Sequence, residues 1–518
     1  MRAVRRGGRG SRLGYTVWEM RWAAIAVVFL QSAAAQTVPT LRSETRVVQI
    51  DVVAKDSHGH IVEDLSKEDF TLKDEDKHRG IQIFSINRGQ PVADATPLAQ
   101  PLPPNVFSNR VTKAGSASIH ATAILLDGIN DYFDNYAGSR AQVISLIGRL
   151  RPDERVAIYV LSLDKGLIIL QDYTTDHDLL VRNLSAYIPS GMIPAPVAME
   201  RLGQAFASLP APPRLEREFF MRNGAESART AIQAIANHMA IVPGRKSLLW
   251  VSQGFPPRQI RESSDSWAKT IDVMNQANVE LDAVDSNGLA GPPRRWGPGG
   301  VASLQELAER TGGKAYYNRN DLDVGMAEAI EDKRTSYTLA FYLGDDERDG
   351  RFHRLAVLVN RPHLDLHYRQ GYIAGADRRM EQAQKKAELE SALLSPLDST
   401  GVGITMSIEF ADGKPRGTLR IRTSLDPATI SLAEKGNRWE GKFDEMFVEM
   451  NADGKTIAKI SSSRRFQLNA AQHHRFEREG VTYSQEIPCE NGAAKVHAII
   501  RDAETGHVGS LTMPLKRP

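Results

Sequence analysis

The chain has 518 residues, of which 41% are apolar and 25% are charged, with 40 Gly, 26 Pro and a single Cys. This composition excludes a collagen, a fully disordered chain and a disulfide-stapled mini-protein, and the length predicts about three domains. Residues 1–35 hold six Arg and one Glu, so the rest of the chain has a net charge of −3. A near-neutral chain gives no electrostatic reason to expect nucleic-acid binding.

The N-terminus has the residue order of an export signal. Five Arg residues lie within the first twelve positions, an apolar run follows at 22–30, and three Ala residues occupy 33–35. We therefore predict a signal peptide at 1–35, cleaved near Ala35-Gln36, and a secreted or periplasmic protein. The apolar run is too short to cross a bilayer as a helix.

The segment after this signal has the pattern of β-strands. Apolar residues alternate with polar ones over 45–54, 69–74 and 80–86, which is typical of half-buried strands. These strands predict a small β-sandwich of immunoglobulin-like character at 45–90. Residues 91–117 are rich in Pro, Ala, Ser and Asn, and they predict a linker.

From residue 118 the chain alternates buried strands with amphipathic helices. Continuous apolar runs predict strands at 121–126, 155–161, 246–251 and 279–284. Helical spacing of apolar residues predicts helices at 138–150, 176–188, 226–241, 264–277 and 301–311. This alternation predicts an α/β domain at 118–345, built on a doubly wound and mostly parallel sheet with helices on both faces.

The remaining chain returns to strand patterns. Residues 346–376 are predicted to form edge strands of the central region, and 377–396 a polar linking helix. Short alternating runs separated by turns predict a second β-sandwich at 397–518. The predicted architecture is therefore a central α/β domain flanked by N-terminal and C-terminal β-sandwich domains.

Oxygen-bearing side chains follow the predicted central strands. Asp127, Asn130 and Asp131 come after the first strand, Ser252 after the third and Asp285 after the fourth. Because the carboxyl ends of parallel strands share one edge of a sheet, ligands bind there in open α/β sheets. Carboxylate and amide oxygens are also the ligands that Mg²⁺ prefers.

An apolar strand that ends in Asp, followed by a helix and by a later strand that leads into Gly, resembles the von Willebrand factor A (VWFA) domain. The order of longer segments resembles the VWFA-related proteins of Acidobacteria, and these segments are 47–84, 243–247, 304–313, 316–317, 337–342 and 369–372. The resemblance covers nearly the whole chain after the signal. It implies a VWFA-like, Rossmann-like fold with a metal-ion-dependent adhesion site. In such a site, an acidic residue of the partner completes the coordination shell of a divalent cation.

The adhesion-site motif is degenerate in this chain. Asp127 matches the first Asp, Ile129 replaces the first Ser and cannot ligate a metal, and Asp131 replaces the second Ser. Gln253 stands where the family has a later Asp. The resemblance thus implies Asp127, Asn130 and Asp131 as the metal residues, with Mg²⁺ bound weakly or not at all. The alternative is that Asp127 caps the following turn.

No complete catalytic group is evident in the sequence. Ser252 lacks the first Gly of a Gly-x-Ser-x-Gly elbow and has no Asp/His pair placed to activate it. The leading hypothesis is a secreted VWFA-like binding or adhesion protein, not an enzyme, that recognises another protein or a cell-surface or matrix polymer. Two alternatives remain: an extracytoplasmic metal-dependent hydrolase using Asp127 and Asp131, and a structural or assembly factor with a vestigial metal site.

Overall fold

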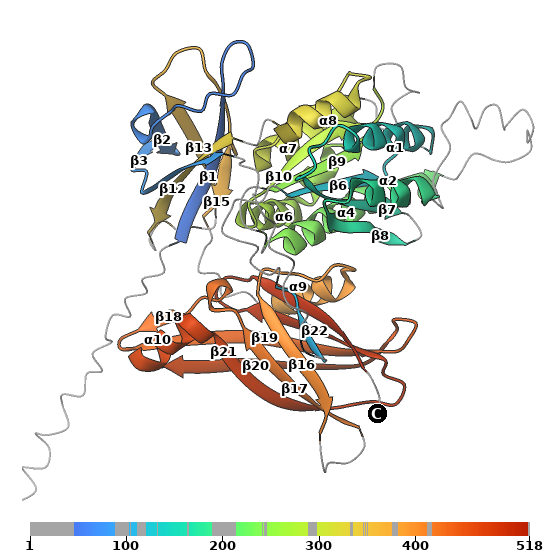
Figure 1. The fold of residues 1–518 in the computed structure, drawn as a ribbon, viewed down its shortest axis with the longest axis vertical. Coiled ribbons are helices and arrows are strands. Elements are labelled where there is room, and N and C mark those ends of the chain that lie inside the picture. Colours follow the sequence, from blue (N-terminus) through green and yellow to red (C-terminus); the bar gives the residue numbers. More distant parts are fainter. Residues whose placement is uncertain are drawn as a thin grey trace, which may run out of the picture. The chain divides into compact units, whose positions relative to one another are not determined.

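The computed structural model describes three sets of packed elements (Figure 1). The described residues are 46–88, 103, 105–110, 121–131, 133–162, 165–188, 214–240, 242, 246–288, 298–331, 335–344, 347, 349, 351–374, 382–411 and 417–515. The predicted signal peptide lies outside them. Within these residues, no helix combines the length and the apolar character that crossing a membrane requires.

The central domain, residues 121–331, is built on a six-stranded sheet in the order β11-β10-β9-β6-β7-β8. Five strands are parallel and β8 is antiparallel to β7. The strands are β6 (Ala121–Asp127), β7 (Arg155–Ser162), β8 (Gly166–Thr174), β9 (Lys246–Ser252), β10 (Val279–Asp285) and β11 (Ala315–Tyr316). The helices are α1 (Phe133–Ile147), α2 (His177–Ala186), α4 (Arg214–Met239), α5 (Arg258–Glu262), α6 (Ser264–Gln276), α7 (Pro298–Thr311) and α8 (Leu322–Glu331).

Both faces of the central sheet are buried by helices. Ala123 and Leu125 of β6 belong to a core shared with α4, α5, α6 and α7, whereas Ile124 and Leu126 belong to a second core shared with α1, α2 and α8. Successive residues of a strand point to opposite faces, so a strand covered on both sides must be apolar throughout. This explains why the central strands appear in the sequence as continuous apolar runs.

The predicted α/β class of the central domain is confirmed by these elements. Each of the four predicted strands is present and extends one residue further at its carboxyl end. The five predicted helices are also present, with shifted ends. We did not predict β8, β11, α5 or α8 from the sequence, although the buried apolar residues of α8, at 322, 326, 329 and 330, recur at helical spacing.

The N-terminal β domain combines two distant chain segments, 46–88 and 335–374. Its sheets have the orders β14-β1-β12-β4 and β15-β13-β2-β3, and one hydrophobic core contains residues of both. The strands are β1 (Arg46–Lys55), β2 (Phe70–Asp74), β3 (Lys77–Arg79), β4 (Ile83–Arg88), β12 (Thr335–Leu343), β13 (Phe352–Val359), β14 (Asp365–His367) and β15 (Gly371–Ile373), with a 3₁₀ turn η1 at Lys67–Asp69.

The positions of β12 and β13 differ from the prediction. We expected 335–345 to belong to the central domain and 346–376 to form its edge strands. Instead β12 pairs antiparallel with β1 and β4, placing Ile50 opposite Leu339, and β13 pairs with β2 and β15. The pattern of a strand predicts that one face is buried but not which partner buries it.

The C-terminal β domain also has two sheets around one core. The first has the order β21-β17-β16-β5, with β5 (Val106–Ser108), β16 (Ile404–Phe410), β17 (Thr418–Leu425) and β21 (Val481–Pro488). The second contains β18 (Ala433–Lys435), β19 (Arg438–Met450), β20 (Thr456–Leu468), β22 (Lys495–Asp502) and β23 (Val508–Pro514). The other elements are α9 (Gln382–Leu394), α10 (Ala470–Glu479) and the 3₁₀ turn η3 (Pro427–Thr429).

The predicted linker at 91–117 contributes one strand to this domain. Residues 106–108 form β5 and pair antiparallel with β16, so Phe107 lies opposite Met406. The linker prediction is therefore wrong for these three residues. A three-residue strand has too short a pattern to be recognised in the sequence.

Tyr337 ties the two segments of the N-terminal β domain. Its fully buried hydroxyl donates to the carbonyl of Val62 at 2.8 Å and accepts the Leu65 backbone N–H at 3.0 Å. We expect Tyr337→Phe to lower the free energy of unfolding by about 1–3 kcal/mol, because a buried donor and acceptor lose their partner. Tyr342→Phe, on the exposed side of the same strand, is the control and should change it by less than about 0.5 kcal/mol. Equal effects in denaturant titration would contradict this assignment.

Candidate functional site

The central sheet has a topological switch point between β6 and β9. From β6 the chain crosses through α1 to β7 on one side, whereas β9 lies on the other side of β6. Ligands of open α/β sheets bind outside the carboxyl ends of the strands at such a point. Asp127 is the last residue of β6 and Ser252 is the last residue of β9, so both lie at the switch point.

Asp127 is buried, and both of its carboxylate oxygens accept several hydrogen bonds. Oδ1 accepts the backbone N–H groups of Ile129 at 3.1 Å and Asn130 at 3.0 Å. Oδ2 accepts the side chains of Asn130 at 2.8 Å, Ser252 at 2.9 Å and Trp250 at 3.1 Å. Asp127 is 1% exposed. This carboxylate therefore joins the β6–α1 turn to the end of β9.

Two opposing effects act on the ionisation of Asp127. Burial raises the pKa of Asp127, while the hydrogen bonds from Asn130, Ser252 and Ile129 lower it, and the net direction is upward. Five donors directed at two oxygens suit an acceptor without a proton of its own. The group therefore acts as a hydrogen-bond centre whose charge is partly compensated by the donors around it.

Asn130 and Asp131 form hydrogen bonds with different parts of the domain. The Asn130 amide bridges from Asp127 to the backbone carbonyl of Gly224 in α4 at 3.1 Å. Gly224 has no room for a side chain, because a Cβ there would lie 2.4 Å from Asn130 Oδ1. Asp131 instead accepts the hydroxyl of Ser286, which follows β10, at 2.8 Å. The predicted residues thus connect β6 to α4 and to the end of β10.

The residues that follow β9 are also closely packed, against α7. The Gly254 N–H donates to Ser252 Oγ at 2.9 Å, and the Phe255 N–H donates to Ser303 Oγ of α7 at 3.0 Å. Gly254 has a φ of +68°, and a Cβ there would lie 2.3 Å from the carbonyl oxygen of Gly300. Only glycine allows this approach of α7. Ser252 is completely buried and donates to a carboxylate, so it is not an accessible nucleophile.

The arrangement of these residues does not fit a resident divalent cation. Ile129 is buried within the hydrophobic core, and Asp127 already receives five N–H or O–H donors. A cation and a hydrogen-bond donor compete for the same oxygen lone pairs, and Mg²⁺ demands near-octahedral oxygen ligands. Across the described part of the chain, no three His, Cys, Asp or Glu side chains are grouped so as to hold a metal.

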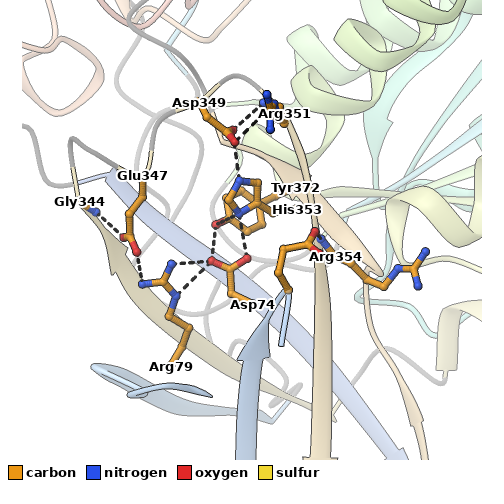
Figure 2. A network of polar contacts seen from close by, with 10 residues as sticks. Asp74, Arg79, Gly344, Glu347, Asp349, Arg351, His353, Arg354 and Tyr372 are labelled. Atoms are coloured by element: carbon orange, nitrogen blue, oxygen red, sulfur yellow. Dashed lines mark hydrogen bonds and ion pairs between the residues drawn. The ribbon is translucent and has the colours of Figure 1, made fainter. Parts of the chain in front are cut away.

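A second polar cluster, which the sequence did not predict, surrounds Asp74 at the end of β2 (Figure 2). Asp74 Oδ2 accepts Arg79 Nη2 at 2.7 Å and the Tyr372 hydroxyl at 2.9 Å, and Oδ1 lies 3.0 Å from His353 Nδ1. Burial and the Asp74 charge raise the pKa of Tyr372, so its hydroxyl remains a donor. These contacts join β2 and β3 of the first chain segment to β13 and β15 of the second.

Two carboxylates from the β12–β13 connection extend this cluster. Arg79 Nη1 lies 2.6 Å from Glu347 Oε1, and His353 Nε2 lies 3.2 Å from Asp349 Oδ1. Burial opposes ionisation of Glu347, but the Gly344 N–H and the Arg79 charge outweigh it and lower its pKa. His353 thus lies between two carboxylates, with one ring nitrogen facing Asp74 and the other facing Asp349. The cluster is a cross-link between chain segments, since its members contact one another.

No family model and no curated protein matches this chain. Similar solved structures include an aerotolerance-related membrane protein from Bacteroides fragilis, at 14% identity over 41% of this chain and 98% of that chain, with a TM-score of 0.25. Another is proximal thread matrix protein 1 from the mussel byssus with a zinc-occupied MIDAS motif, at 13% identity over 43% and 48%, with a TM-score of 0.26.

A third similar structure is the vWF domain of the type V pili tip protein Mfa5 from Porphyromonas gingivalis. It is 13% identical over 26% of this chain and 38% of that chain, with a TM-score of 0.17. The similar structures thus include a VWFA domain and a matrix protein.

Removing the Asp127 carboxylate tests its role as a hydrogen-bond centre. We expect Asp127→Ala to lower the free energy of unfolding by at least about 3 kcal/mol, because five buried donors lose their acceptor. Asp127→Asn should cost less, since one oxygen remains. Asp153→Ala, in the turn before β7, is the control and should be nearly neutral. Denaturant unfolding of the three variants measures this, and a stable Asp127→Ala protein would contradict it.

Asp74 can be tested in the same way. Asp74→Ala leaves Arg79 and His353 beside a vacated, buried position, and we expect a loss of about 3–5 kcal/mol in the free energy of unfolding. Asp76→Ala, an exposed carboxylate in the adjacent turn, should change it by less than about 0.5 kcal/mol. A loss below 1 kcal/mol for Asp74→Ala would show that the cluster contributes little.

Proposed function

We propose that this chain is an exported, VWFA-like binding or adhesion protein. Its central domain recognises another protein, or a cell-surface or matrix polymer, at the carboxyl-end rim of the parallel sheet. The N-terminal and C-terminal β domains, each of which combines residues from before and after the central domain in the sequence, act as β-sandwich modules. The observation that carries this proposal is the position of the Asp127 hydrogen-bond centre at the switch point between β6 and β9.

The Asp127 centre supports recognition because it fixes the loops of the rim. Its five hydrogen bonds connect the β6–α1 turn with β9, and Asn130 extends the connection to α4. A surface whose loops are already ordered loses less conformational entropy when a partner binds. A rigid rim therefore suits binding to a macromolecule.

Binding is favoured over catalysis by the burial of the chemically active groups. Asp127, Asp131 and Ser252 are at most 1% exposed, and each is hydrogen-bonded to protein groups. A general base or nucleophile must reach the substrate within hydrogen-bond distance. A metal-dependent hydrolase would also need open coordination positions at Asp127, which the five donors occupy. Recognition at this rim is therefore proposed to be independent of a cation.

Affinity capture from envelope and secreted extracts tests this proposal with the full chain as bait. We expect the same partner to be retained in EDTA and in Mg²⁺ or Ca²⁺. Arg258→Glu, an exposed charge reversal at the first residue of α5, the helix that follows β9, should weaken retention about tenfold, which corresponds to about 1.4 kcal/mol. Asp153→Lys, at the opposite edge of the sheet, is the matched control and should bind normally.

Other outcomes separate the alternatives. Turnover of a small substrate that Asp127→Asn abolishes would favour the hydrolase. Stable oligomers that both charge reversals leave intact, without rim-dependent capture, would favour a structural or assembly factor. Retention that requires a cation would overturn the proposed cation independence.

A further inference from the structure

Helix α9 packs on the outer face of the sheet that contains β19 and β22. Leu389 and Ala392 of α9 are buried in a small hydrophobic cluster that is separate from the main core of the domain. The sheet residues of this cluster are Met446, Val448, Ile499 and Val508. The face that α9 covers is therefore a second, smaller apolar surface of the C-terminal β domain.

The helix α9 is expected to be stable only while it is packed on this sheet. The helix has 13 residues, QAQKKAELESALL, and most of them are polar. An isolated helix of this length is marginal in water, and most helical stability in proteins comes from packing of an apolar face. Weakening the contact with the sheet should therefore loosen the helix as well.

A buried histidine lies beneath α9. His497 of β22 is 4% exposed, and its Nδ1 lies 2.7 Å from Thr512 Oγ1 of β23. Its Nε2 has no hydrogen-bond partner among the described residues, while the backbone of Ala392 faces the ring from α9. The Thr512 hydroxyl also lies 3.5 Å from Asp398 Oδ1. The ring is thus enclosed by α9, β23 and the segment that follows α9.

The surroundings of His497 favour the neutral ring. Burial lowers the pKa of His497 to about 4, the backbone of Ala392 opposes this shift, and the charge of Lys495 adds to it. Asp398 is the nearby carboxylate, and burial raises its own pKa. A histidine freed from this site would have a pKa of about 6.5. The stabilisation that the neutral His497 ring gives to the docking of α9 is therefore fully present above pH 6.5 and is progressively lost as the pH falls from 6.5 towards 4.

A buried ion pair joins α9 to the same face of the sheet, at some distance along β22 from His497. Arg501 of β22 is 1% exposed, and its guanidinium contacts the carboxylate of Glu388 in α9. Asp444 of β19 lies 3.6 Å from Arg501 and accepts the hydroxyl of Ser463. A buried ion pair of this kind costs desolvation that its attraction barely offsets. It therefore fixes the position of α9 more than it strengthens the docking.

We propose that α9 is an acid-releasable strap, which is docked on the C-terminal β domain at neutral pH and detaches when His497 takes up a proton. The strap lies in the chain between β15 and β16, so its release lengthens the connection between two domains. A 13-residue helix spans about 20 Å, whereas the same residues extended reach about 43–47 Å. Acid would thus increase the reach of the chain independently of the proposed binding function.

Hydrogen exchange of the full chain, measured by mass spectrometry at pH 7.5 and pH 5.0, tests the strap. Exchange rates are corrected for the intrinsic effect of pH. The shift of His497 from 6.5 to about 4 predicts that protection of α9 is about 30-fold lower at pH 5.0. Protection of β22 should not change. Equal protection of α9 at both pH values, or parallel loss in α9 and β22, would overturn the proposal.

A pair of histidine variants identifies the group that titrates. His497→Leu should abolish the difference in α9 protection between the two pH values. His474→Leu, an exposed histidine of α10, should keep the full 30-fold difference. A His497→Leu protein that still releases α9 in acid would overturn the assignment to His497. If this variant does not fold, the comparison of α9 with β22 in the unmodified chain decides the proposal by itself.

Discussion

The carboxylate of Asp127 fixes the ends of the central strands relative to one another. A parallel sheet leaves its loops at one edge, and nothing in the backbone ladder determines how these loops meet. Here a single buried acid accepts hydrogen bonds from its own turn, from Trp250 and from Ser252. The carboxyl-end rim at Asp127 is therefore organised by hydrogen-bond donors of the protein itself.

The central domain was the part of the fold that the sequence predicted best. Strands buried on both faces give long apolar runs, and these runs cannot be confused with exposed segments. The β domains were predicted less well, because their strand pairs join distant residues. The pattern around Tyr337 predicts that its side chain faces a core. Nothing in the neighbouring sequence indicates that its strand pairs with β1 and not with a strand of the preceding α/β domain.

The candidate site was located but not understood from the sequence. Asp127 could be recognised because it ends an apolar strand. Trp250 could not, since its indole N–H lies within a buried strand and has no sequence signature of a polar role. The Asp74 cluster was missed for a related reason: its members are separated by up to 298 positions and meet only through tertiary pairing.

The division of the N-terminal β domain into two segments has a consequence for synthesis. Of the four strands in the first segment, only β2 and β3 pair with each other; β1 and β4 pair with strands that follow the central domain. Leu65 precedes its partner Tyr337 by 272 residues. A ribosome that adds about 5–20 residues per second leaves these strands unpaired for roughly 14 to 54 s. During that interval their apolar side chains and unpaired strand edges are exposed to aggregation.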